Sequence, residues 1–305
     1  MARPGAENET IMTSLRLAGH GLGIAFYLVG VFFFALNDAL GKWLVADYAV
    51  GQMLVLRSIG AGIVLLPMVW QMRVNPFDFG QWRLQILRIV CMAGDTFAFY
   101  YSTRTMPLAD VMTFYMAAPL IITALSAPLL GERVEPFRWA AVLAGFVGVV
   151  IALQPSAAIL SSASPIALFG AVMFGLSATV TRRLRRTHWL PLVLWQFVGA
   201  GIIGGATIPF AWTTPDLLDL CLLFLVGIVS MLCFVCITRA LALSPAAMLA
   251  PFQYSAMLWA TLLGWMVWRD VPTLPIVVGN LVIIASGLFV IYRDRLSGMM
   301  RAAET

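Results

Sequence analysis

Residues Gly30–Leu44 (GVFFFALNDALGKWL) and Gly170–Leu184 (GAVMFGLSATVTRRL) align without gaps at a shift of about 140 residues. At almost the same shift, Arg57–Val64 falls on Gln196–Ile203. Internal symmetry of this kind is typical of secondary transporters, which are often built from duplicated units. The pattern therefore predicts two copies of one structural unit.

Composition indicates that both copies lie in a membrane. Hydrophobic residues make up 61% of the chain and charged residues 11%, which is more apolar surface than one water-soluble core of 305 residues can bury. A helix of about 20 apolar residues crosses about 30 Å of hydrocarbon. Segments of that kind lie at 22–46, 50–70, 84–103, 108–130, 137–154, 164–181, 190–211, 217–238, 246–268 and 274–292.

The predicted fold is thus an all-α polytopic membrane protein with ten transmembrane helices, five in each copy. Because five is odd, the second copy must enter the membrane in the opposite orientation, so the repeats are inverted. We expect a cytoplasmic N-terminal segment at 1–21, a first repeat at 22–154, a second repeat at 164–292 and a cytoplasmic tail at 293–305.

Basic residues support this topology, because Lys and Arg gather on the cytoplasmic side of membrane proteins. The loops assigned to one side, with the two chain ends, hold most of the arginines, whereas the other side has only Lys42, Arg104 and Arg269 near its surface. Both termini are therefore predicted to be cytoplasmic. The arginines on the basic side are Arg3, Arg16, Arg73, Arg83, Arg88, Arg133, Arg138, Arg182, Arg183, Arg185, Arg186, Arg239, Arg293, Arg295 and Arg301.

Several classes of chemistry have no sequence support. The chain has no GxxxxGK[ST] phosphate loop, no HExxH pair and no GxSxG elbow, and its only histidines are His20 and His188. We expect no enzymatic activity, no cofactor, no metal site, no nucleic-acid binding and no obligate protein partner. The expected partners are the lipid bilayer and a small-molecule substrate.

Polar side chains at membrane depth are expensive and are functional candidates by default. The first repeat places five of them in its first three spans: Asn37, Asp38, Lys42, Arg57 and Asp95. Two interpretations stay open. The two acids and two bases form a neutral network that locks these helices together, or they line a water-filled cavity that binds a zwitterion.

Prolines and aromatic residues point to the same region. Pro119 and Pro128 in the fourth span, and Pro251 in the ninth, predict paired helix breaks of the kind that mark transport pathways. Helix packing alone would also explain prolines there. Most aromatic residues of a membrane protein serve packing, and a minority could form an apolar pocket. The candidates for the cavity wall around these breaks are Phe99, Tyr101, Tyr115, Gln253, Tyr254 and Trp259.

These features together resemble the drug/metabolite transporter (DMT) superfamily, and within it the EamA-type ten-helix carriers. The matching elements are the duplication, Lys42 at the end of the first helix, the LRSIGAG stretch around Arg57, and Ala118–Pro136 with its Gly131-Glu132-Arg133 motif. The resemblance is closest to the YddG-type exporters of aromatic and other amino acids. It implies a basket-like bundle in the bacterial inner membrane with a central cavity between the repeats.

The predicted function is export of amino acids or similar small amphipathic metabolites by alternating access. Lys42 and Arg57 would hold an anionic group or balance the acids, and Asp38 and Asp95 would engage an ammonium or a proton. A carrier of organic cations and drugs is the first alternative, for which Arg57 would be unfavourable. A membrane scaffold that transports nothing is the second.

Overall fold

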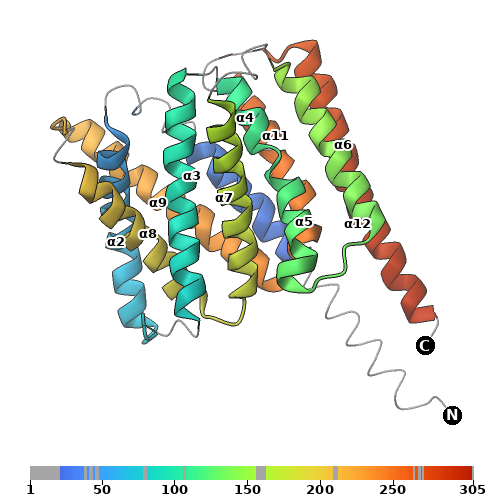
Figure 1. Cartoon of the computed structure of the whole chain (residues 1–305), viewed down its shortest axis with the longest axis horizontal. Helices are drawn as coiled ribbons and strands as arrows, with labels where there is room; N and C mark the ends of the chain where they lie inside the picture. The colour runs from blue at the N-terminus through green and yellow to red at the C-terminus, as the bar shows by residue number, and fades with distance from the viewer. Residues whose placement is uncertain are drawn as a thin grey trace.

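The computed structural model describes residues 21–37, 40, 44, 48–77, 81–105, 108–155, 163–208, 212–263, 265, 266, 269 and 271–303. These residues are almost entirely helical (Figure 1). The first repeat comprises the helix Gly21–Asn37, α2 (Val50–Gln71), α3 (Trp82–Thr105), α4 (Leu108–Tyr115), α5 (Ala118–Leu130) and α6 (Pro136–Leu153). The second comprises α7 (Ser164–Arg183), α8 (Trp189–Thr207), α9 (Leu217–Leu243), α10 (Ala246–Leu249), a 3-10 turn η3 (Ala250–Tyr254), α11 (Ser255–Leu263) and α12 (Leu274–Ala303).

Membrane crossing follows from length and hydropathy. Among the described residues, eight segments are long and apolar enough to span a bilayer, and the shorter apolar helix Gly21–Asn37 and the less apolar α3 bring the number of candidate spans to ten. Large apolar side chains such as Ile63, Ile202 and Leu281 point outward, with 58%, 66% and 60% of their surfaces exposed. In water such a surface would drive aggregation, whereas lipid tails are its natural solvent. The predicted fold class is confirmed.

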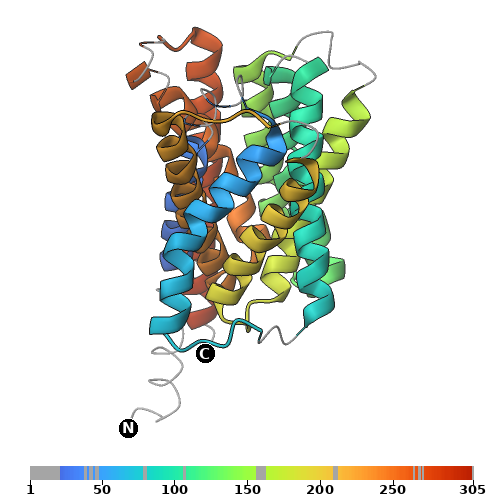
Figure 2. The same cartoon turned by 90° about the vertical axis from the view of Figure 1, so that its left-hand side faces the viewer.

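The two repeats pack with opposite orientations, and equivalent helices meet. The helices α2 and α8, which occupy the same place in each repeat, lie side by side (Figure 2). The start of α2 meets the end of α8, because a Cβ atom on Gly204 would lie 2.6 Å from the carbonyl oxygen of Gly51. Equivalent helices that pack antiparallel across a shared interface are what an inverted repeat requires.

Glycines repeat the same contact in both copies. Gly60 of α2 packs directly on the backbone of Phe224 in α9, and its sequence counterpart Gly199 of α8 packs on Ile89 of α3. The second helix of each repeat therefore rests on the third helix of the other. Small residues at such positions allow the close approach by which membrane helices associate.

The fourth span of each repeat is broken. The first break is a two-residue turn between α4 and α5, and Pro119 lies at the start of α5. The second is the 3-10 turn η3, which contains Pro251. Proline fits the first turn of a helix, where its missing N–H has no helical partner to lose. Pro128 differs, because it lies inside α5 and the helix continues through it to Leu130.

The fifth helices of the repeats, α6 and α12, pack together along one lateral side of the bundle (Figure 1). Gly148 and Gly279 meet there, so that a Cβ atom on Gly148 would lie 2.8 Å from the Gly279 carbonyl oxygen. The helices between this pair and the α2–α8 pair surround the region described next.

Candidate functional site

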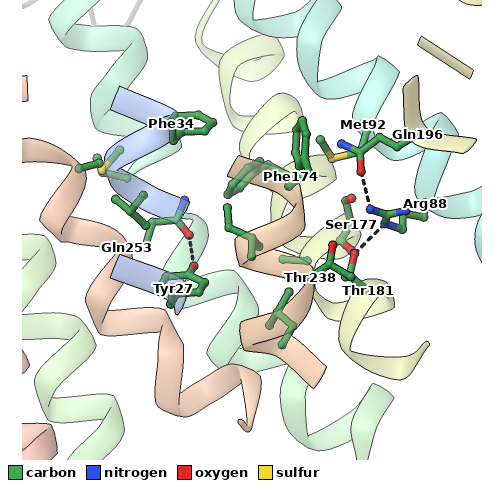
Figure 3. Close-up of a pocket in the computed structure, with 17 residues that line it drawn as sticks. Tyr27, Phe34, Arg88, Met92, Phe174, Ser177, Thr181, Gln196, Thr238 and Gln253 are labelled. Atoms are coloured by element: carbon green, nitrogen blue, oxygen red, sulfur yellow. Dashed lines mark hydrogen bonds between the residues drawn. The ribbon is translucent and has the colours of Figure 1, made fainter. Parts of the chain in front are cut away.

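A cavity of about 50 Å³ lies between the repeats. One water needs about 10–15 Å³ of such space, so the cavity holds a few waters, and a metabolite fits only after the helices that line it move apart. Both repeats contribute, through the first helix, α3, the turn that breaks the fourth span, α7, α8, α9 and the broken ninth span. The walls carry Tyr27, Val31, Phe34, Arg88, Met92, Met116, Phe174, Ser177, Ala178, Thr181, Gln196, Phe234, Ile237, Thr238, Leu241, Gln253 and Ala256 (Figure 3).

Arg88 supplies a guanidinium to one wall of this cavity. It lies six residues after Trp82, the first residue of α3, which puts it about 9 Å into the helix at 1.5 Å per residue. Its side chain is only 2% exposed. Its Nε donates to the Thr181 hydroxyl at 2.8 Å, Nη1 donates to the Leu192 carbonyl at 2.7 Å, and Nη2 donates to Oε1 of Gln196.

The environment of Arg88 is polar but uncharged. Its acceptors among the described residues are a hydroxyl, a carbonyl and a side-chain amide. These hydrogen bonds orient the guanidinium without neutralising it. A buried charge without a counter-ion is costly, and a planar guanidinium pairs best with a carboxylate or a phosphate. The chemistry of this wall therefore suits one anionic group.

The opposite wall carries a neutral polar pair. The Tyr27 hydroxyl of the first helix donates to Oε1 of Gln253 at 2.9 Å, and Gln253 belongs to the 3-10 turn of the ninth span. Figure 3 shows this pair across the cavity from Arg88. The broken helix thus brings an amide to the cavity. An amide and a phenol can hydrogen-bond a second polar group of a substrate.

Two aromatic rings, Phe34 and Phe174, face each other at one end of the cavity (Figure 3). They are sequence counterparts in the two repeats, and their centroids are 6.4 Å apart with the planes inclined by 58°. Met92, Met116 and Phe234 add apolar surface. Thioethers and aromatic rings adapt well to flat or irregular apolar groups. The cavity combines a cation with an apolar wall.

A smaller cavity of about 10 Å³ adjoins the first. Its walls come from α2, α3 and α8, and Met92 and Gln196 line both cavities. Arg57 lies in its wall, together with Thr96 and four apolar residues, Leu54, Ile89, Ala93 and Ala200.

Two of the residues predicted at the site line these cavities: Gln253 the larger and Arg57 the smaller. Asp95 is buried outside both linings, and its backbone carbonyl accepts a hydrogen bond from the Tyr115 hydroxyl at 2.9 Å. Phe99 packs edge-on against Tyr115, with centroids 5.2 Å apart. Tyr101 lies on the outer surface of α3 and is 55% exposed.

Three further candidates pack or hydrogen-bond outside the two cavity linings. Tyr254 is fully buried against Gly145 of α6, and Trp259 packs edge-on against Phe32. Asn37 accepts a hydrogen bond at 2.5 Å from Ser230 of α9. Asp38 and Lys42 lie outside the described residues. The structure therefore gathers only part of the predicted set at one site.

Two arginines that were predicted to lie at the loops, Arg88 and Arg182, are buried inside the bundle. Arg88 is buried in the cavity wall. Arg182 is buried at the end of α7, where its Nε donates to Oε1 of Glu132 at 2.7 Å and its Nη1 donates to the Leu241 carbonyl. A count of positive charges along the chain gives the side of the membrane but not which guanidinium turns inward. The available signal was that both residues lie within or next to predicted spans.

The EamA-like transporter family model matches residues 21–154 and again residues 161–292. The chain belongs to this family. The EamA-like relatives include the S-adenosylmethionine uptake transporter of Rickettsia bellii, at 24% identity over 92% of this chain and 96% of the relative. A riboflavin transporter of Rhizobium johnstonii is 28% identical over 70% of this chain and 71% of the relative. The pseudopaline exporter of Pseudomonas aeruginosa is 24% identical over 87% of this chain and 94% of the relative.

A solved crystal structure has the same fold, with a TM-score of 0.76 and 18% identity over 91% of this chain and 98% of that one. The family places the protein among membrane transporters of small molecules, as the resemblance to the DMT superfamily implied. The relatives carry S-adenosylmethionine, riboflavin and pseudopaline, so they do not single out amino acids.

Proposed function

We propose that this transporter carries amino acids and related amphipathic metabolites that have a carboxylate, and that the carboxylate binds Arg88. The observation that carries the proposal is the buried guanidinium, held by neutral acceptors in the wall of a cavity between the repeats. An aromatic or aliphatic side chain of the substrate would rest against Phe34 and Phe174. The Tyr27–Gln253 pair would receive the ammonium or another polar group.

The cavity chemistry disfavours organic cations that have no carboxylate, the alternative substrate class. Such a cation would meet the Arg88 guanidinium, which has no carboxylate partner among the described residues, in a site of low dielectric constant, where like charges repel strongly. S-adenosylmethionine remains a second candidate, because it is by its name an amino acid with an adenosyl group and is the substrate of a relative. It would also present a carboxylate to Arg88.

We further propose that the protein works as an exporter in a bacterial inner membrane, with both termini in the cytoplasm. The excess of arginine near the start of α3, the end of α7 and the end of α12 supports this orientation. Arg88 lies in the half of the membrane next to that side, so a substrate from the cytoplasm reaches it early. Comparing transport in inside-out and right-side-out vesicles tests the direction.

Ligand binding by the purified protein tests the substrate class. Thermal unfolding is measured with L-phenylalanine, with phenethylamine, which lacks the carboxylate, and with 3-phenylpropanoate, which lacks the ammonium. S-adenosylmethionine and tetraphenylphosphonium complete the panel. A ligand at a hundred times its dissociation constant adds about 2.7 kcal/mol to stability. We expect stabilisation by the carboxylates alone. Stabilisation by tetraphenylphosphonium or phenethylamine, but not by any carboxylate, would overturn the proposal.

A further inference from the structure

The smaller cavity contains the second guanidinium of the region. Arg57 lies seven residues after Val50, the start of α2, and lines this cavity with Gln196 of α8 and Thr96 of α3. Arg57 and Gln196 are sequence counterparts in the two repeats. They belong to α2 and α8, the equivalent helices that pack on each other. The cavity therefore lies where the inverted repeats meet.

Gln196 connects the two cavities. Its Oε1 accepts the hydrogen bond from Arg88, and its side chain lines both the larger and the smaller cavity, as does Met92. A carboxylate bound at Arg88 would compete with Gln196 for the same guanidinium hydrogens. Once displaced, the Gln196 amide is free to turn toward the smaller cavity.

The two arginines also lie at different depths. Arg88 is about 9 Å from the end of the bundle at which α3 begins, and Arg57 is about 11 Å from the opposite end, at which α2 begins, at 1.5 Å per residue. With about 30 Å of hydrocarbon, this leaves about 10 Å between their levels. That distance is about twice the length of one helical turn.

We propose that the Arg57 cavity is a second anion subsite, reached from Arg88 past Gln196, and that the substrate carboxylate moves from one guanidinium to the other during transport. The inference rests on the proposed function, since it names where the same carboxylate goes next. A relay of two cations would keep an anion paired while it crosses the low-dielectric interior. In the described state this cavity has a volume of about 10 Å³, the space of a single water, so the carboxylate enters it only when the repeats move and widen it.

Separate measurements of binding and translocation test the relay. In proteoliposomes, Arg57→Gln should lower the counterflow rate of a carboxylate substrate by about tenfold or more, the usual effect of losing a charge-assisted hydrogen bond. Binding at equilibrium should change by less than about threefold, since Arg88 is intact. Arg57→Lys keeps a point charge without the planar fork and should transport at an intermediate rate. Arg83→Gln, an exposed charge on α3, is the matched control.

A second variant changes Gln196, which lines both cavities. Gln196→Glu is nearly isosteric and places a fixed carboxylate next to Arg88 and the smaller cavity. We expect it to raise the melting temperature of the empty protein and to weaken binding of carboxylate ligands by about tenfold or more. If the Gln196→Glu protein binds carboxylate ligands as tightly as the wild type does, the relay is overturned.

Two results for Arg57 would also overturn it. If Arg57→Gln transports at the wild-type counterflow rate, Arg57 forms no second subsite. If Arg57→Gln loses as much carboxylate affinity as Arg88→Gln does, the two arginines belong to one subsite. If Arg57→Gln does not fold, wild-type counterflow by Arg57→Lys has the same meaning. Failure of the proposed function is distinguishable, because wild-type protein would then not bind carboxylates at all.

Discussion

Arg182 of the second repeat and Glu132 of the first form an ion pair of 2.7 Å, with side chains only 6% and 13% exposed. The other carboxylate oxygen of Glu132 accepts the backbone N–H of Ala246, the first residue of α10. Nη1 of Arg182 donates to the carbonyl of Leu241, a residue of the cavity wall. One pair therefore ties the segment after α5 to α7, α9 and α10 next to the cavity.

Breaking this pair should destabilise the protein strongly. Glu132→Gln leaves the Arg182 charge buried without its counter-ion, which costs about 3 kcal/mol or more. The melting temperature in detergent should fall, and the double variant with Arg182→Gln should recover part of the loss. Arg183→Gln is the control, because Arg183 is exposed and makes one long hydrogen bond to the Leu129 carbonyl. Equal losses of melting temperature in Glu132→Gln and Arg183→Gln would contradict the role of the pair.

Glycine contacts on α2 give a second test. A Cβ atom on Gly60 would lie 2.5 Å from the Phe224 carbonyl oxygen, whereas one on Gly62 would have nothing within 4 Å. Gly60→Ala should therefore cost about 1–3 kcal/mol through overpacking of α2 against α9. Gly62→Ala should be neutral or slightly stabilising, since alanine favours the helix. Thermal unfolding of the two variants side by side checks this, and a larger loss at Gly62 would refute the described helix packing.

The facing rings Phe34 and Phe174 should set the preference for apolar side chains. Phe174→Ala removes aromatic contact and should weaken binding of L-phenylalanine by about tenfold, the equivalent of about 1.4 kcal/mol. Binding of L-alanine should change much less. Phe169→Ala, on the outer face of the same helix, is the control. A uniform loss for both amino acids would show that Phe174 supports the fold rather than the substrate.

Much of the fold was predictable from the sequence because the bilayer restricts the choices. Apolar length fixed the spans, and an odd number of spans per repeat fixed the inversion. Pro119 and Pro251 marked the fourth and ninth spans, in which the helices are broken. Pro128 carried no such information, because tertiary packing kept α5 helical through it.

The cavity was less predictable, because it depends on which face of each helix turns inward. The sequence predicts Arg88 and Arg182 at the loops. In the structure Arg88 is buried in the cavity wall, and Arg182 is buried in the ion pair that joins the two repeats. Tyr101 and Asp95 have the residue types of a binding site, but α3 turns Tyr101 outward and keeps Asp95 outside both cavity linings. Hydropathy is similar on all faces of such helices, so the sequence holds little information on rotation about the axis.

The most direct test of the account compares the dissociation constants of L-phenylalanine and phenethylamine in wild-type protein and in Arg88→Gln. The two ligands differ only in the carboxylate, so their ratio isolates its contact with the protein. We predict at least about tenfold preference for L-phenylalanine in the wild type, reduced to about one in the variant, with Arg83→Gln behaving as wild type. An unchanged preference in folded Arg88→Gln protein would contradict the central claim that this guanidinium holds the substrate carboxylate.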